Sequence, residues 1–226
     1  MRIGSKALEK LREFQESICK RAIFEDSFER IEYVAGVDIA YRGELALGVA
    51  VLLDLDGLEV LEFKKSLKRI VFPYIPTYLA FREAIPIMDA LNSLSRRPDL
   101  VVFDSHGLAH PRFCGCATHV GVLMDIPSIG VAKKLLVGRH EPLPEEEGSY
   151  SPIVYMGRVV GFAFRSKKGC RPIYVSPGHR VSLKTSLELV KSMVKGYRIP
   201  EPTRMAHKLS VSILKDIKSI GSQKSS

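Results

Sequence analysis

The pattern of apolar residues changes once along this chain, and that change restricts the possible folds more than any other feature of the sequence. Three closely spaced apolar runs, at residues 32–41, 45–55 and 58–67, predict an antiparallel meander. Beyond them, helical patterns alternate with continuous apolar runs at 98–104 and 126–133, which is typical of a parallel sheet. The sequence therefore predicts an α/β fold with a mixed sheet, an antiparallel meander followed by parallel strands, flanked by helices.

The remaining segments extend this expected sheet and cover it. Apolar residues at three- and four-residue steps, such as Leu8, Leu11 and Phe14, predict an amphipathic first helix. Pro86 predicts a kink or restart within the second helix, because proline has no backbone N–H to donate. The expected helices cover 5–23, 77–95, 114–126, 181–195 and 202–219, with a hairpin at 151–166 and a short strand at 172–176. Because the chain lacks a Pro/Gly/Ser-rich linker, we expect one domain spanning residues 1–226.

The composition narrows the cellular setting and the kind of partner. The formal net charge is +9, from 34 basic and 25 acidic residues, which is typical of a protein that binds a polyanion. No apolar run reaches the roughly 18 residues that span a bilayer, so we expect a cytoplasmic protein that makes no membrane contact. Four cysteines in 226 residues do not indicate a disulfide framework. We also expect a monomer.

Two aspartates lie where the sequence allows a cation site. Asp38 interrupts an otherwise apolar strand, so its carboxylate is hydrogen-bonded, paired or bound to a cation, or else lies at a strand edge facing solvent. Asp104 closes the strand at 98–104, at the end where ligand sites of α/β sheets collect. If the two strands are neighbours, their carboxylates can share a Mg²⁺ ion, and Glu83 can complete the cluster. One metal ion and two metal ions are both compatible with this pattern.

Lys133, His207 and two of the cysteines each have two interpretations. Lys133 ends a predicted strand, and it either orients water and neutralises phosphate or lies in solvent beside Lys134. His207 is either a partly buried core residue or a neighbour of the metal. Cys114 and Cys116, with histidines nearby, superficially suggest zinc, but a structural zinc site usually has a second ligand pair at regular spacing. We therefore treat these cysteines as loop or helix-face residues.

A series of motifs, in one order along the chain, resembles the endonuclease V family of deaminated-base repair enzymes. They extend from about residue 33 to residue 208 and read VAGVD, FPYIPTYLAFRE, PDLVVFDSHGLAHPR, IGVAKKLL, PIYVSPGH and RIPEPTRMAH. The resemblance implies a ribonuclease H-like fold and a metal-dependent phosphodiester hydrolase of DNA repair. It further implies Mg²⁺-dependent cleavage at the second phosphodiester bond on the 3′ side of deoxyinosine, with Mn²⁺ as a substitute metal.

The same resemblance implies the catalytic residues and the partner. By position in the motifs, Asp38, Glu83 and Asp104 look like the family's acidic set, which binds metal and is catalytic. Lys133 looks like the family's active-site lysine, and His207 is similar to a histidine near the metal. The implied partner is DNA containing deoxyinosine or another deaminated base. Two alternatives stay open: a ribonuclease for inosine-containing RNA, and a non-catalytic binder of distorted nucleic acid, which has no use for three mutually repelling carboxylates.

The resemblance also implies the residues that contact nucleic acid. The stretch PYIP looks like a wedge that separates strands at the lesion, and its two prolines restrict φ so that the tip loses little entropy on insertion. The damaged base is expected to be turned out of the stack into a pocket near Gly107, where a missing side chain lets backbone amides approach the base. The expected contacts are Pro73, Tyr74, Ile75, Pro76, Arg82, Gly107, His110, Arg112 and His119.

Overall fold

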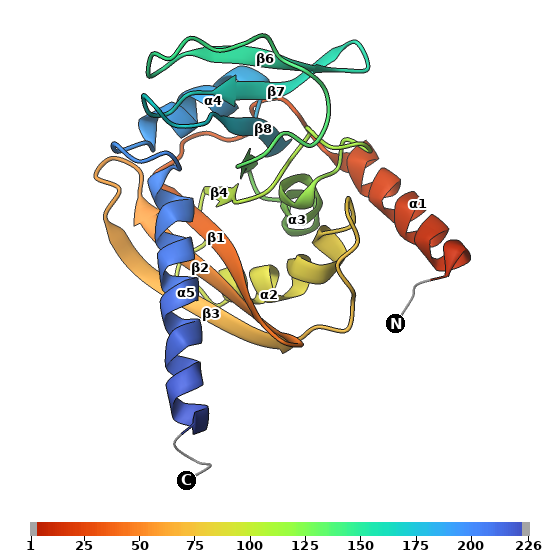
Figure 1. Cartoon of the computed structure of the whole chain (residues 1–226), viewed down its shortest axis with the longest axis vertical. Coiled ribbons are helices and arrows are strands. Elements are labelled where there is room, and N and C mark those ends of the chain that lie inside the picture. Colours follow the sequence, from red (N-terminus) through yellow and green to blue (C-terminus); the bar gives the residue numbers. More distant parts are fainter. Residues whose placement is uncertain (1–3, 223–226) are drawn as a thin grey trace.

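The computed structural model describes residues 4–222, and it shows helices packed against both faces of a twisted sheet (Figure 1). The helices are α1 (Ser5–Arg21), α2 (Ala80–Asn92), α3 (Cys116–Met124), α4 (Leu183–Ser192) and α5 (Glu201–Ser222). The strands are β1 (Tyr33–Arg42), β2 (Leu45–Asp54), β3 (Val60–Arg69), β4 (Leu100–Phe103), β5 (Ser128–Ala132), β6 (Tyr150–Tyr155), β7 (Arg158–Phe164) and β8 (Ile173–His179). None of the helices in this range is both long and apolar enough to cross a bilayer.

The strands form one sheet in the order β3-β2-β1-β4-β5-β8-β7-β6. β1, β2 and β3 are antiparallel neighbours, whereas β4 pairs in parallel with both β1 and β5. β8 then runs antiparallel to β5 and joins the sheet to the β6–β7 hairpin. The predicted mixed sheet, an antiparallel meander followed by parallel strands, is therefore confirmed.

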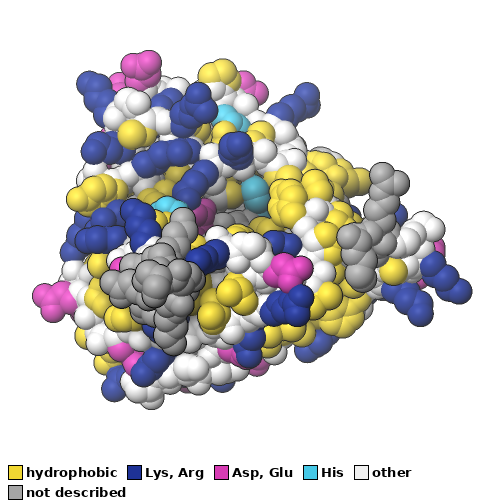
Figure 2. Space-filling model, turned by 60° about the horizontal axis from the view of Figure 1, so that its bottom comes forward, with side chains coloured by type: hydrophobic (Ala, Val, Ile, Leu, Met, Phe, Trp, Pro, Cys, Tyr) yellow, Lys and Arg dark blue, Asp and Glu magenta, His cyan; other side chains and the backbone are white. Residues whose placement is uncertain are grey.

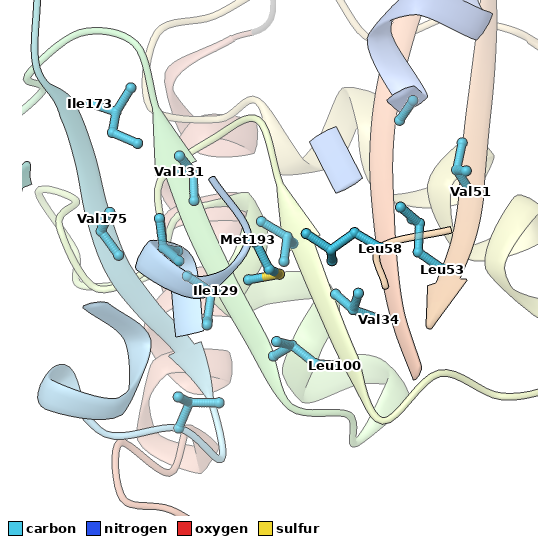
Figure 3. Packing of buried hydrophobic residues seen from close by; sticks show 14 of the residues in the cluster. Val34, Val51, Leu53, Leu58, Leu100, Ile129, Val131, Ile173, Val175 and Met193 are labelled. Atoms are coloured by element: carbon cyan, nitrogen blue, oxygen red, sulfur yellow. The ribbon is translucent and has the colours of Figure 1, made fainter. Parts of the chain in front are cut away.

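Side chains alternate between two cores along the central strands, because successive residues of a strand point to opposite faces. On β1, Val34 packs in a core shared with α4 and α5, whereas Ala35 packs in a core shared with α2 and α3. In Figure 1, α5 crosses in front of β1 and β2. Figure 3 shows the first core, where Met193 lies among Leu58, Leu100 and Ile129. Burial on both faces explains the continuous apolar sequence of these strands.

Two glycines allow helices to approach the sheet closely. A Cβ atom at Gly36 of β1 would lie 1.9 Å from the carbonyl oxygen of Pro202 in α5. A Cβ atom at Gly48 of β2 would lie 2.4 Å from the carbonyl oxygen of Pro86 in α2. Neither distance is possible between real atoms, so any other residue would push the helix away from the sheet. The two glycines therefore set the spacing of α5 and α2 from the strands that they cover.

Several elements differ in their bounds from the sequence prediction, α2 and β8 among them. Helix α2 begins at Ala80 rather than at residue 77, because Thr77 has a φ of +70° and belongs to the preceding loop. The helix also continues through Pro86 without a restart. Pro86 is buried against Gly48, so packing on β2 compensates for the backbone hydrogen bond that proline cannot make. Strand β8 extends to His179, beyond the expected end at residue 176.

Replacing Gly36 with alanine should destabilise the fold by at least about 3 kcal/mol, because the backbone of Pro202 would have to move off β1. The measurement is the free energy of unfolding in urea, followed by circular dichroism. Gly4→Ala is the matched control, since a Cβ atom at that position meets nothing within 4 Å. Equal stability of the two variants would show that the seating of α5 does not depend on this contact.

Candidate active site

The pairing of β1 with β4 brings the two predicted aspartates together. The parallel strands are in register at Val37 and Phe103, so Asp38 and Asp104 follow as the next residues of neighbouring strands. Asp104 comes directly after β4, at the carboxyl end of that strand. The condition under which the sequence predicted a shared cation site, that the two strands are neighbours, is therefore met.

Asp38 is held from α5. The hydroxyl of Ser210 donates a hydrogen bond to Oδ2 of Asp38, and Nδ1 of His207 lies 3.3 Å from the same oxygen. The Asp38 side chain is only 10% exposed, whereas that of His207 is 51% exposed. His207 therefore lies at the rim of the site with one ring nitrogen toward the carboxylate, and it is not a core residue.

Glu83 reaches the same site from α2. It lies in the first turn of that helix and, together with Asp38 and Asp104, lines a cavity of about 150 Å³. Its Oε1 accepts a 2.5 Å hydrogen bond from the hydroxyl of Tyr41, which lies on β1. Tyr41 is three residues beyond Asp38, so the two side chains leave β1 on opposite faces, and Tyr41 meets Glu83 on the side of α2. Because Asp38, Glu83 and Asp104 all line the cavity, three acidic residues that are far apart in the sequence lie around one space.

Burial makes this cavity unfavourable for unpaired negative charge. Burial raises the pKa of Asp38 above its usual range, and the hydrogen bond from Ser210 opposes that shift. Burial also raises the pKa of Glu83 to about 7; the hydrogen bond from Tyr41 opposes this shift, and the charges of Asp38 and Asp104 reinforce it. A bound cation would remove the repulsion and favour the ionised form of each carboxyl group.

The cationic partner that the protein itself supplies is Lys133. Its Nζ forms an ion pair with Oδ2 of Asp104. In this arrangement no group of three or more His, Cys, Asp or Glu side chains within residues 4–222 is placed to hold a metal ion. The chemistry of the donors nevertheless fits a hard divalent cation, because all three are carboxylates. A metal ion bound by Asp104 would compete with Lys133 for the same oxygen.

A second cavity, of about 300 Å³, adjoins the first, because Asp104 and Ser105 line both. Lys133 and Tyr74 also line it, so the cavity extends from the acidic residues to the loop before α2. Its other walls include Gln15, Thr77, His106, His110, Cys116 and Leu136. The volume lies at the lower end of the range of ligand pockets in proteins. The two cavities together form one continuous candidate site.

A larger and more open hollow, of about 780 Å³, lies near Asp99 and Asp125 at the opposite end of the parallel strands. Several of its charged groups are engaged with the protein: Arg180 pairs with Asp125, and Arg97 donates to the carbonyl oxygen of Asp125. His179, on β8, also contacts Asp125, through Nε2 at 3.1 Å. We therefore assign this hollow and His179 to the structural contacts of the chain, despite the greater volume.

The predicted wedge, Pro73–Pro76, lies in the loop between β3 and α2. Tyr74 is 67% exposed and lines the second cavity. Arg82, predicted to contact nucleic acid, is engaged with the protein: its Nη1 donates a 2.6 Å hydrogen bond to the carbonyl oxygen of Phe72, and its guanidinium lies 4.6 Å from the centre of the Tyr41 ring. Arg82 therefore ties the start of this loop to α2.

Gly107 and His119, both predicted to lie at the nucleic-acid site, are buried. The amide of Gly107 donates to Oγ of Ser176 at 3.0 Å, and Gly107 does not line the second cavity. His119 is 3% exposed, and its ring centre lies 5.2 Å from that of Phe81 and 5.8 Å from that of Phe14. In this structure both residues are therefore packed within the protein.

Sequence reasoning missed four side chains at the site, namely Gln15, Tyr41, Thr77 and Ser210. Gln15 carried a signal that could have been used, since it is a polar residue on the apolar side of the first predicted helix and is 1% exposed. Tyr41 and Ser210 carried none, because their contacts depend on how β1, α2 and α5 pack. His110 and Arg112, which were predicted, both contact Thr77 at the end of the loop.

Comparison with known proteins identifies the class and then the family. The crystal structure of endonuclease V from Streptomyces avermitilis is 36% identical, covers 93% of this chain and 94% of its own, and has a TM-score of 0.87. The catalytic domain of human endonuclease V is 29% identical, covers 97% of this chain and 99% of its own, and has a TM-score of 0.89. The fold is therefore ribonuclease H-like, and together with the acidic cavity it defines a nuclease.

The sequence matches the Endonuclease V family over residues 12–208. Endonuclease V of Roseiflexus sp. strain RS-1 is 50% identical over 204 residues, which are 90% of this chain and 92% of that protein. The chain therefore belongs to the endonuclease V family, as its motifs predicted. A family member from Ciona intestinalis, 29% identical with a TM-score of 0.84 over 94% of this chain and 100% of its own, was solved in complex with a 24mer DNA containing an inosine followed by a ribo-adenosine.

Replacing His119 with phenylalanine should make the protein less sensitive to acid. Burial lowers the pKa of His119 to about 4 from its ordinary value of 6.5. The unfolded chain therefore binds the proton first, so the stability contributed by neutral His119 is complete above about pH 6.5 and is lost as the pH falls toward 4. The variant should lose a slope of about 1.4 kcal/mol per pH unit in this window, measured by urea unfolding at successive pH values. An unchanged slope would contradict the assignment of a buried neutral histidine.

Proposed function

We propose that this protein is a DNA repair endonuclease that requires Mg²⁺ and hydrolyses the second phosphodiester bond on the 3′ side of deoxyinosine. The proposal rests on one observation: Asp38, Glu83 and Asp104 line a cavity that adjoins a second cavity beside the exposed loop Pro73–Pro76. Membership of the endonuclease V family and the inosine-containing DNA bound by the Ciona relative support the choice of substrate.

In this proposal Asp38, Glu83 and Asp104 hold Mg²⁺, and Mn²⁺ can substitute for it. Bound Mg²⁺ supplies a Lewis acid that neutralises charge on the phosphodiester and lowers the pKa of an attacking water. The protein's contribution is to fix the ligands: Ser210 orients the carboxylate of Asp38, and Tyr41 orients that of Glu83. Both hydrogen bonds are made to single carboxylate oxygens, so the other oxygen of each group remains available.

Lys133 and His207 act beside the carboxylates. Lys133 lines the second cavity and pairs with Asp104. Its ammonium group can therefore exchange that carboxylate for a phosphate as its ion-pair partner. His207, half exposed beside Asp38, can donate a hydrogen bond to the departing strand or to water at the rim. Both residues therefore stabilise or move charge at the reacting phosphate, while the acidic residues hold the cation.

The exposed loop acts as the wedge, and the second cavity receives the base. Insertion of an aromatic or apolar side chain between base steps costs about a few kcal/mol of lost stacking, which new contacts to the distorted duplex offset. Tyr74 has the exposure that this role requires and also lines the second cavity. A base displaced by the loop can therefore enter a pocket whose floor is Asp104 and Ser105, close to the carboxylates.

Affinity for the nucleic-acid backbone is supported by the basic surface. The face in Figure 2 carries Lys and Arg side chains around a central region in which acidic and histidine side chains are visible. Cations placed around an acidic centre can hold the phosphates of a polyanion while the centre binds metal. Inosine-containing RNA is the second candidate substrate, because the DNA in the Ciona complex carries a ribo-adenosine directly after its inosine.

Asp104→Asn should reduce nicking of an inosine-containing duplex by at least about a hundredfold, because a neutral amide binds Mg²⁺ far less well than a carboxylate does. Nicking is measured on end-labelled duplexes with Mg²⁺, with the adenine duplex and a chelator as controls, and DNA binding should change little. Asp56→Asn, at an exposed position in the turn between β2 and β3, is the matched control and should keep wild-type activity. Wild-type protein that nicks no inosine substrate with any divalent metal would contradict the proposed function.

Tyr74→Ala should reduce the preference for inosine duplex over undamaged duplex by on the order of tenfold, because one base–aromatic stacking contact contributes about 1–3 kcal/mol. Affinity for undamaged DNA should stay within about twofold, since the wedge supplies little of the contact to phosphate. The two affinities are measured by fluorescence anisotropy of labelled DNA. Val71→Ala, 75% exposed just before the loop, is the control. A preference that survives in Tyr74→Ala would remove the wedge assignment.

A further inference from the structure

The loop that carries Tyr74 ends in a strained residue. Thr77 has a φ of +70°, in the left-handed region that β-branched residues rarely adopt. A residue keeps such a conformation only where surrounding contacts fix it, and residues of this kind collect at functional sites. The contacts of Thr77 therefore show what holds the end of the loop.

Three side chains from two other segments converge on the carbonyl oxygen of Thr77. Nη2 of Arg112 donates a 2.7 Å hydrogen bond, Nε2 of His110 lies at 3.0 Å, and Nε2 of Gln15 donates at 3.3 Å. The same Nη2 of Arg112 also donates to the side-chain oxygen of Thr77, at 2.7 Å. A carbonyl oxygen that accepts from three side chains leaves the peptide little freedom to rotate.

Gln15 links this contact to α1, a helix that lies outside the sheet. It is 1% exposed, its Oε1 accepts a 2.6 Å hydrogen bond from Nε of Arg112, and its Nε2 donates to the carbonyl oxygen of Cys114 at 2.7 Å. Each polar atom of this buried amide thus has a partner. A buried glutamine in the middle of an amphipathic helix is costly unless its hydrogen bonds are made, and here they join α1, the loop and Arg112.

His110 is fixed in one neutral form. Because a carbonyl oxygen can only accept, Nε2 of His110 carries the proton that faces Thr77, and Nδ1 accepts the backbone N–H of Arg112 at 3.2 Å. Burial lowers the pKa of His110 to about 3, so the ring stays uncharged next to the guanidinium. This contact to Thr77 therefore persists across the range of pH in which a DNA enzyme works.

The other end of the loop is also anchored. Arg82, on α2, donates to the carbonyl oxygen of Phe72 at 2.6 Å. Two arginines thus hold the two ends of the segment, Arg82 at Phe72 and Arg112 at Thr77, while Tyr74 between them remains exposed. The loop is therefore fixed at both ends, while the side chain at its tip is exposed to solvent.

We propose that Gln15, Arg112 and Thr77 form a clamp that positions the wedge, so that Tyr74 meets a duplex in one preset orientation. The proposal rests on the proposed function of the loop as a wedge, and it makes these three positioning residues, because none of them needs to contact the reacting phosphate. Presetting a loop removes the ordering cost at the moment of insertion. The clamp therefore serves strand separation at the lesion, and cleavage of an already unpaired strand does not require it.

The first test measures the loop in the absence of DNA. The chain contains no tryptophan, so Tyr74→Trp places a single tryptophan at the tip, whose fluorescence can be excited separately from that of the tyrosines. In this background, Gln15→Met should add a nanosecond component to the anisotropy decay, because a loop released at its base moves on that timescale. Ile18→Val is the matched control, a buried change on the same helix that leaves the loop contacts intact. Thr77→Val, which removes only the hydroxyl that accepts from Arg112, is the milder second variant.

The second test compares two substrates with the native Tyr74 in place. In Gln15→Met, nicking of an inosine duplex should fall on the order of tenfold more than nicking of inosine in single-stranded DNA, because a change in the wall of the second cavity affects both substrates whereas release of the loop affects only the duplex. Ile18→Val should keep both activities. An unchanged anisotropy decay in both Gln15→Met and Thr77→Val, or an equal loss on the two substrates, would overturn the clamp. If the loop becomes more mobile in Gln15→Met but the wild-type protein nicks neither substrate, the clamp is supported and the proposed function is rejected.

Discussion

The parallel pairing of β1 with β4 is the constraint on which the rest of the molecule depends. It puts Asp38 beside Asp104, and both desolvation and mutual repulsion oppose such an arrangement. The strands hold it because they are buried on both faces, by α4 and α5 on one side and by α2 and α3 on the other. Apolar burial contributes about 25 cal/mol per Å², so two cores can readily offset one unfavourable carboxylate pair. The free energy lost by burying the carboxylates at the site is thus offset by the packing of the central sheet.

The sequence predicted what depends on local pattern. Strands, helices and the change from antiparallel to parallel pairing follow from the spacing of apolar residues, and Asp38 and Asp104 were visible because each interrupts or ends an apolar run. Tyr41 and Ser210 were not visible, because neither departs from the pattern of its own element; their contacts exist only once β1, α2 and α5 are packed. Arg82 shows a further limit: a cation in a nucleic-acid motif suggested a phosphate contact, which stays a prediction, and nothing in the sequence indicated that this side chain also donates to the carbonyl oxygen of Phe72.

Helix α2 couples the two halves of the candidate site. Neighbouring residues of its first turn serve both: Glu83 lines the acidic cavity, and Arg82 anchors the start of the loop that we propose as the wedge. Tyr41 contacts both side chains, since its hydroxyl binds Glu83 and its ring lies under the guanidinium of Arg82. The separation between the wedge and the carboxylates is therefore set by one rigid turn of helix packed on the sheet through Gly48. The proposed cleavage at a fixed distance from the lesion requires such a fixed separation, because a flexible connection would spread the cut over several phosphates.

The same contacts change how the net charge of +9 should be interpreted. Arg82 and Arg112 lie beside the proposed DNA site, yet their guanidinium groups are engaged with protein oxygens and with the rings of Tyr41 and Tyr78. A guanidinium whose hydrogen bonds are made to the protein has fewer donors free for direct phosphate contacts, so it should displace fewer counterions from DNA than a free arginine does. Its charge still lowers the potential energy of phosphate nearby. In the proposed complex, then, the arginines near the lesion stiffen the loop, and attraction to the DNA backbone comes from the exposed cations around it.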